Sequence, residues 1–181
     1  MEITFESLYE YLESNKNKLN FISREDVVAE FGVSKFCSLF YDEQRNDIPK
    51  EVLDFLIKEF NITKLDYDFI QIQKYEIGEY ILPHKDRYPC FGLVMLSTSS
   101  KDGLVVQQRD GTYKFYPDKA GTHIDVPKYS WHWVNPVQEK TRYTAVYGLH
   151  PLNNLDAILD QWKTTLYSLI TEGLLVSQAL S

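Results

Sequence analysis

The sequence predicts an α+β protein in which helices come first and a β-sandwich or jelly roll follows. Apolar residues recur at helical spacing in the first 60 residues, and from residue 67 the period changes to two. Seven or eight short candidate strands then follow one another, separated by glycine, proline, aspartate and asparagine. Hydrophobic residues make up 44% of the 181 residues, which is enough to build the core of one domain.

Three helices are expected before the strands. Apolar residues three and four apart predict a helix over residues 5–15. Ser23 and the charged residues behind it predict an N-capped second helix that ends at Gly32. Pro49 is suited to the first turn of a third helix, and an apolar stripe follows it.

The alternation of Ile70 and Ile72 with glutamines marks the first strand. Strands are expected over residues 67–77, 80–84, 91–97, 104–108, 113–116, 122–126, 132–134 and 142–149. Apolar spacing then predicts a C-terminal helix, at about residues 153–176, packed back on the sheet. Without a repeat or a linker, residues 1–181 are expected to form a single domain, with a helical part at 1–63 and a jelly-roll core at about 67–150.

Composition narrows the class of partner. A formal net charge of −7 argues against a broad nucleic-acid interface, which needs clustered Lys and Arg. No apolar run reaches the roughly 20 residues of a membrane span, and the N-terminus lacks the pattern of a signal peptide. Cys37 and Cys90 form no CxxC motif. These features predict a reduced, cytoplasmic protein.

Two short passages carry residues suited to binding a redox metal. His84 and Asp86 lie two apart, so in a strand they present an imidazole and a carboxylate to one face. A second histidine, for which we choose His132, would complete two histidines and one carboxylate. That set is diagnostic of non-haem Fe(II) oxygenases.

An anion-binding residue follows the second histidine. Arg142 comes ten residues after His132, on a strand that can run back beside the strand of that histidine. An arginine there can pair with a carboxylate held near the metal. Thr144 shares a strand face with Arg142, and its hydroxyl could bind the same carboxylate. A metal site next to an arginine and a hydroxyl that bind a carboxylate predicts a 2-oxoglutarate site.

The segments 73–78 and 84–86, together with 132–137 and 141–144, resemble the Fe(II)- and 2-oxoglutarate-dependent dioxygenases, especially the prolyl 4-hydroxylase-like branch. The resemblance covers about residues 70–150 and implies a double-stranded β-helix, the jelly roll of that family. It implies that His84, Asp86 and His132 hold Fe(II), that Arg142 binds the distal carboxylate of 2-oxoglutarate, and that Tyr75 hydrogen-bonds this cosubstrate. The expected reaction uses O2, hydroxylates an organic substrate and releases succinate and CO2.

Several alternatives stay open. His123-Ile124-Asp125 is a second H-x-D triplet, which we interpret as structural because no later histidine with an arginine behind it follows. A cupin-type metal-dependent isomerase and a non-catalytic jelly-roll module are rival functions. The first substrate class is a peptide or protein side chain such as proline, and the second is a free amino acid or another small metabolite. Either a monomer or a homodimer is compatible with the sequence.

Overall fold

The structure is a computed structural model that describes residues 3–25, 28–29, 31–63, 67–86, 91–127 and 129–148. For residues 28–29 and 91, only the backbone is described. All of these residues belong to one compact unit of the chain, residues 1–149. The C-terminal helix expected at about residues 153–176 lies outside the described residues, so it stays a prediction.

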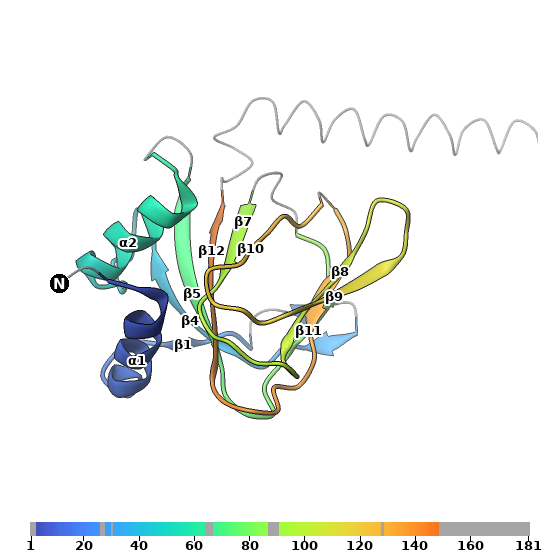
Figure 1. The fold of residues 1–181 in the computed structure, drawn as a ribbon, viewed down its shortest axis with the longest axis horizontal. Coiled ribbons are helices and arrows are strands. Elements are labelled where there is room, and N and C mark those ends of the chain that lie inside the picture. Colours follow the sequence, from blue (N-terminus) through green and yellow to red (C-terminus); the bar gives the residue numbers. More distant parts are fainter. Residues whose placement is uncertain are drawn as a thin grey trace, which may run out of the picture. The chain divides into compact units, whose positions relative to one another are not determined.

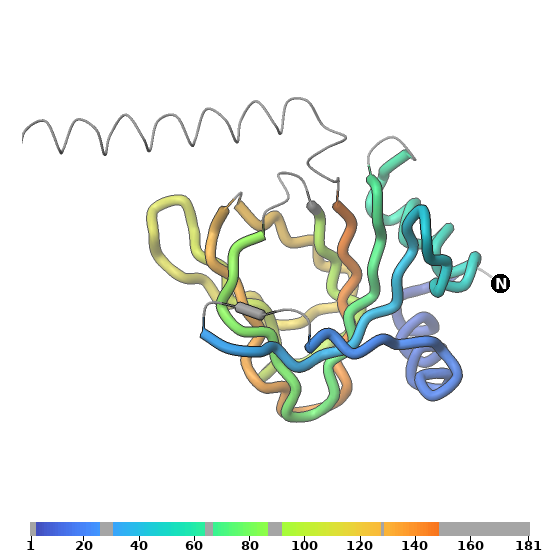
Figure 2. Tube along the Cα trace, turned by 180° about the vertical axis from the view of Figure 1, so that it is seen from behind, coloured from blue at the N-terminus to red at the C-terminus, as the bar shows by residue number. Residues whose placement is uncertain are grey.

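Two antiparallel sheets form the core of this unit. The larger sheet has the strand order β1-β4-β5-β12-β7-β10, and the smaller one has the order β6-β11-β8-β9. The larger sheet contains β1 (Ile22–Ser23), β4 (Cys37–Tyr41), β5 (Phe69–Tyr75), β12 (Arg142–Gly148), β7 (Phe91–Met95) and β10 (His123–Ile124). The smaller sheet contains β6 (Ile81–His84), β11 (His132–Val134), β8 (Gly103–Gln107) and β9 (Tyr113–Pro117). The two sheets face each other, and their strands surround a common interior (Figures 1 and 2). Every strand expected from residue 67 onward is confirmed, with ends shifted by at most a few residues.

Two of the three expected helices are confirmed. α1 (Phe5–Asn15) starts at Thr4, whose hydroxyl accepts a hydrogen bond from the backbone N–H of Ser7, while the Ser7 hydroxyl accepts one from the N–H of Thr4. This reciprocal pair satisfies two of the otherwise unpaired N–H groups at the helix start. α2 (Lys50–Phe60) starts directly after Pro49 and ends at Asn61, which adopts a left-handed conformation. None of the described helices is long and apolar enough to cross a membrane.

The helix expected from Ser23 to Gly32 is wrong. This stretch instead holds β1 and a short hairpin of β2 (Val28–Ala29) and β3 (Gly32–Val33). Ile22 and Ser23 pair with β4, and Val28 and Ala29 pair with β3, so these parts of the expected helix are extended strands. Pairing with a distant strand therefore overrides the local helical spacing of apolar residues.

The pleat of the larger sheet divides the core into two parts. Ile70 and Ile72 of β5 and Tyr143 of β12 point toward α1 and α2, which cover the outer face of this sheet (Figure 1). Alternate residues, including Tyr75, point into the interior between the sheets. Buried apolar residues fill that interior: Phe36, Ile81, Leu93, Met95, Leu104, Val106, Ile124, Val126, Val134, Val137 and Val146. The inward residues of β5 and β12 are thereby placed opposite the smaller sheet.

Candidate metal centre and anion site

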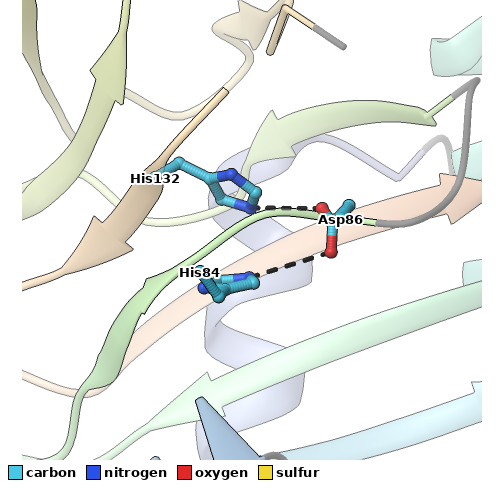
Figure 3. A group of neighbouring side chains, drawn as sticks. All are labelled: His84, Asp86 and His132. Atoms are coloured by element: carbon cyan, nitrogen blue, oxygen red, sulfur yellow. Dashed lines mark ion pairs between the residues drawn. The ribbon is translucent and has the colours of Figure 1, made fainter. Parts of the chain in front are cut away.

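The three predicted metal ligands lie together at one end of the smaller sheet. His84 ends β6 and His132 begins β11, and the two are directly paired across these antiparallel strands. Asp86 follows two residues after His84, just beyond the strand. Its carboxylate faces both imidazoles, with its Oδ2 3.1 Å from Nε2 of His132 and its Oδ1 3.8 Å from Nε2 of His84 (Figure 3). Residues 48 positions apart in the chain thus form one cluster.

Backbone carbonyls orient both imidazole rings. Nδ1 of His84 lies 2.8 Å from the carbonyl oxygen of Leu82, and Nδ1 of His132 lies 3.1 Å from that of Ser130. When Nδ1–H donates to a carbonyl, the lone pair of the ring is on Nε2. In both histidines this is the nitrogen that faces Asp86. The carbonyls therefore favour the tautomer that a metal needs.

Electrostatics favour the ligand forms of the side chains. Burial lowers the pKa of His84, and His132 lowers it further against the opposing effect of Asp86. Burial alone would raise the pKa of Asp86, but the hydrogen bond with His132 and the charges of both histidines outweigh it and lower that pKa. Metal binding requires neutral imidazole and ionised carboxylate. Both shifts favour those forms at neutral pH.

The cluster fits a divalent iron ion. The ligand atoms of His84, Asp86 and His132 all lie within 4.8 Å of one another. Two imidazole nitrogens and one carboxylate are the donor set of the facial triad in non-haem Fe(II) oxygenases. Within the described residues, this is the one group of three metal-ligating side chains that lies so close together.

The second H-x-D triplet lies elsewhere. His123 belongs to β10, at the edge of the larger sheet, where it pairs with Val94. Its ring packs edge-on against Phe60 of α2, with 6.0 Å between ring centroids. The triplet is not part of the described metal cluster.

Arg142 lies in the sheet opposite His132 rather than on a neighbouring strand. Its strand, β12, runs between β5 and β7 in the larger sheet, whereas His132 lies in the smaller sheet between β6 and β8. The expectation that the two strands lie side by side is therefore wrong. The Arg142 side chain is fully buried, at 1% exposure, and its guanidinium carbon lies 5.1 Å from the centroid of the Tyr75 ring.

Thr144 and Tyr75 both contact Gln73, a residue that was not among the predicted site residues. The cross-strand register pairs Arg142 with Tyr75 and Thr144 with Gln73. The side-chain oxygen of Gln73 accepts hydrogen bonds from the Tyr75 hydroxyl at 2.9 Å and from the Thr144 hydroxyl at 3.1 Å. Gln73 lies two residues before Tyr75 in an extended strand, so strand parity could have placed it on the same face. The three residues predicted to bind the cosubstrate share one patch of the interior with Gln73.

A second overlooked residue, Asp118, pairs with Arg142. Nε of Arg142 donates to Oδ2 of Asp118 at 2.8 Å and to Oδ1 at 3.2 Å, and both side chains are 1% exposed. Burial raises the pKa of Asp118, while the charge and hydrogen bond of Arg142 act in the opposite direction. Asp118 directly follows β9 in the other sheet, so no local spacing connects it to Arg142.

The charges of Arg142, Asp118 and Asp86 all act on the Tyr75 hydroxyl. Burial raises the pKa of its hydroxyl strongly, Arg142 opposes the rise, and the carboxylates of Asp118 and Asp86 add to it. Tyr75 is therefore within electrostatic range of a metal ligand and of the Arg142 ion pair.

Comparisons with known proteins identify the fold. No family model matches the chain, and no curated protein is significantly similar to it. Among solved structures, an oxidoreductase of the 2OG-Fe(II) oxygenase family from Burkholderia pseudomallei is 17% identical, with a TM-score of 0.55 over 77% of each chain. A prolyl-4-hydroxylase from Pseudomonas putida is 12% identical, with a TM-score of 0.59 over 82% of this chain and 89% of that one. The chain therefore has the fold of the 2OG-Fe(II) oxygenases, as the resemblance of its motifs implied.

Proposed function

We propose that this protein is an Fe(II)- and 2-oxoglutarate-dependent dioxygenase that hydroxylates an organic substrate. The observation that carries the proposal is the convergence of His84, Asp86 and His132, whose ligand atoms lie within 4.8 Å of one another in this fold. The cupin alternative typically uses more histidines and a glutamate. The buried arginine in the interior also favours a site for a carboxylate cosubstrate over a bare metal site.

Each residue has a role in this proposal. His84, Asp86 and His132 hold the metal, and the carbonyls of Leu82 and Ser130 fix the two rings. Iron with bound 2-oxoglutarate supplies the oxidising chemistry, in which O2 is consumed, 2-oxoglutarate is converted to succinate and CO2, and the substrate gains a hydroxyl group.

The remaining polar residues of the interior bind and orient the cosubstrate. Arg142 provides positive charge for the distal carboxylate, and its burial excludes water that would weaken the interaction. Thr144 and Tyr75 place hydroxyl groups on the same face of the sheet, where both donate to Gln73. To bind the carboxylate, each hydroxyl turns its O–H from Gln73 to the cosubstrate. The apolar side chains around them limit the access of solvent to the reaction.

The substrate class that we put first is a peptide or protein side chain such as proline. The fold similarity to the Pseudomonas putida prolyl-4-hydroxylase supports this choice, as does the resemblance of the motifs to that branch. Succinate release with proline-containing peptides, compared with release with free amino acids, tests the choice directly.

The test of the activity is spectroscopic. Fe(II) and then 2-oxoglutarate are added to metal-free protein without oxygen, and the weak visible charge-transfer band of a chelated 2-oxo acid is recorded. We expect the band in the native protein and in the control His123→Ala, no band in His132→Ala, and a need for far more 2-oxoglutarate in Arg142→Ala. A native protein that binds the metal but shows no band would overturn the proposal in favour of a cupin-type site or a non-catalytic module.

A further inference from the structure

The Arg142–Asp118 ion pair joins the two sheets inside the protein. Arg142 comes from β12 of the larger sheet, and Asp118 directly follows β9 of the smaller sheet. Both side chains are 1% exposed. A buried guanidinium without a partner would cost several kcal/mol, so a carboxylate at 2.8 Å is needed to keep it in the interior.

Asp118 contacts only one edge of the guanidinium. Both of its oxygens lie on the Nε side, at 2.8 and 3.2 Å, and Nη2 contacts the sulfur of Met95 at 3.4 Å, a weak acceptor. A guanidinium has five N–H donors in a rigid plane, and a second carboxylate can bind the two Nη groups end-on. Among the described residues, the carboxylate of Asp118 therefore engages Nε of Arg142 and leaves the Nη groups without a carboxylate partner.

Backbone hydrogen bonds hold Asp118 in place. Its N–H donates to the carbonyl of Asp102 at 2.9 Å, and its carbonyl accepts from the N–H of Ser99 at 3.0 Å. The Asp102 carboxylate in turn accepts from the N–H groups of Gln138, at 2.7 Å, and Glu139, at 3.1 Å. Those two residues lie just before β12.

These hydrogen bonds connect the two partners of the ion pair, Asp118 and Arg142. The turn at residues 99–102 is bonded to Asp118 on one side and to the segment that leads into Arg142 on the other. A carboxylate fixed in this way limits the rotation of the arginine. The Tyr75 ring, 5.1 Å from the guanidinium carbon, limits it further from another direction.

We propose that Asp118 is a positioning residue for the cosubstrate: it holds Nε of Arg142 so that the Nη groups face the distal carboxylate of 2-oxoglutarate. This inference rests on the proposed function. The alternative is that Asp118 competes with the cosubstrate for Arg142. Positioning predicts that loss of Asp118 weakens cosubstrate binding, whereas competition predicts that it strengthens binding.

The experiment compares two ligands in three variants. Anaerobic titrations with Fe(II) present measure the half-saturating concentration of 2-oxoglutarate and of 2-oxopentanoate, in which a methyl group replaces the distal carboxylate. The variants are Asp118→Ala, Asp118→Asn, which keeps an oxygen for Nε, and the control Asp125→Asn, which removes the charge of an exposed carboxylate.

We expect the half-saturating concentration of 2-oxoglutarate to rise at least about tenfold in Asp118→Ala and less in Asp118→Asn, because the amide still accepts from Nε. Values for 2-oxopentanoate and for Asp125→Asn should stay at the native level. Tighter binding of 2-oxoglutarate, an unchanged value, or an equal loss for both ligands would each overturn the inference. If Asp118→Ala does not fold, Asp118→Asn alone decides.

Failure of the inference is distinct from failure of the proposed function. The proposed function fails when the native protein shows no charge-transfer band with bound Fe(II). The inference fails when the native protein shows the band and the variants do not lose affinity selectively for 2-oxoglutarate.

Discussion

Tyr75 and Arg142 lie directly opposite each other on β5 and β12, with the guanidinium carbon 5.1 Å from the centroid of the tyrosine ring. The next inward pair along these strands is Gln73 and Thr144. The strand register therefore places four side chains of the proposed cosubstrate site together, since a shift of either strand by one residue would turn its two side chains to the helical face.

The first prediction concerns Gln73. In Gln73→Glu, a carboxylate replaces the amide close to the expected position of the distal carboxylate of 2-oxoglutarate. We expect the half-saturating concentration of 2-oxoglutarate in the anaerobic titration to rise at least about tenfold, because like charges repel strongly in a buried site. Gln71→Glu, two residues earlier on the strand, is the matched control. Equal affinity in native protein and Gln73→Glu would place the cosubstrate elsewhere.

The second prediction concerns the metal. Asp86→Ala removes one of three ligands, so we expect Fe(II) affinity to fall by more than the about 10- to 100-fold that loss of an outer partner costs. Asp125→Ala removes the carboxylate of the second H-x-D triplet and should bind Fe(II) as the native protein does. Anaerobic equilibrium dialysis measures both. Loss of affinity in Asp125→Ala instead would show that we assigned the wrong triplet.

The third prediction concerns the stability of the fold around β8. A Cβ on Gly103 would lie 2.1 Å from the carbonyl oxygen of Tyr116 and 2.8 Å from the Phe115 ring, so the backbone of β9 would have to move. We expect Gly103→Ala to lower the free energy of unfolding by about 1–3 kcal/mol. Urea denaturation measures the loss, and Ser100→Ala, at an exposed position nearby, should have little effect. An unchanged stability would mean that β8 and β9 do not pair in this register.

The fourth prediction concerns pH. The Glu76 carboxylate contacts Lys74 at 3.1 Å and accepts from the Thr141 hydroxyl at 3.0 Å. Burial alone would raise its pKa, but Lys74, Thr141 and Lys16 outweigh burial and lower it below the ordinary value of 4.5. The unfolded chain therefore takes up the proton first as pH falls, and the contribution of Glu76 to stability is present above pH 4.5 and lost below it.

We accordingly expect Glu76→Gln to be less stable than the native protein at pH 7, by about 1 kcal/mol or less because the group is partly exposed. The difference should shrink as pH falls below the ordinary pKa of the unfolded chain. Denaturant titrations across this range measure it, with the exposed Glu43→Gln as control. A difference that grows on acidification would contradict the direction of the shift.

The spacing of residues along the chain was enough to predict the three members of the metal cluster and the strands from residue 67 onward. The spacing of two between His84 and Asp86 predicted that both face one point. Although β6 ends at His84, Asp86 just beyond the strand does face the same cluster. The alternation at Ile70 and Ile72 identified β5 for the same reason, because period two is a property of the extended chain itself.

Which strands and side chains pair with one another depends on how distant segments fold together. The stretch around Ser23 has helical spacing of apolar residues, yet Ile22 and Ser23 pair with β4, since hydrogen bonds to a neighbouring strand outweigh a weak local preference. Likewise, Asp118 meets Arg142 because the two sheets fold against each other, bringing together residues 24 positions apart. Local spacing indicates which face of its strand a side chain occupies. Its partner across the interior depends on strand register and sheet packing, and the sequence of a short segment does not specify either.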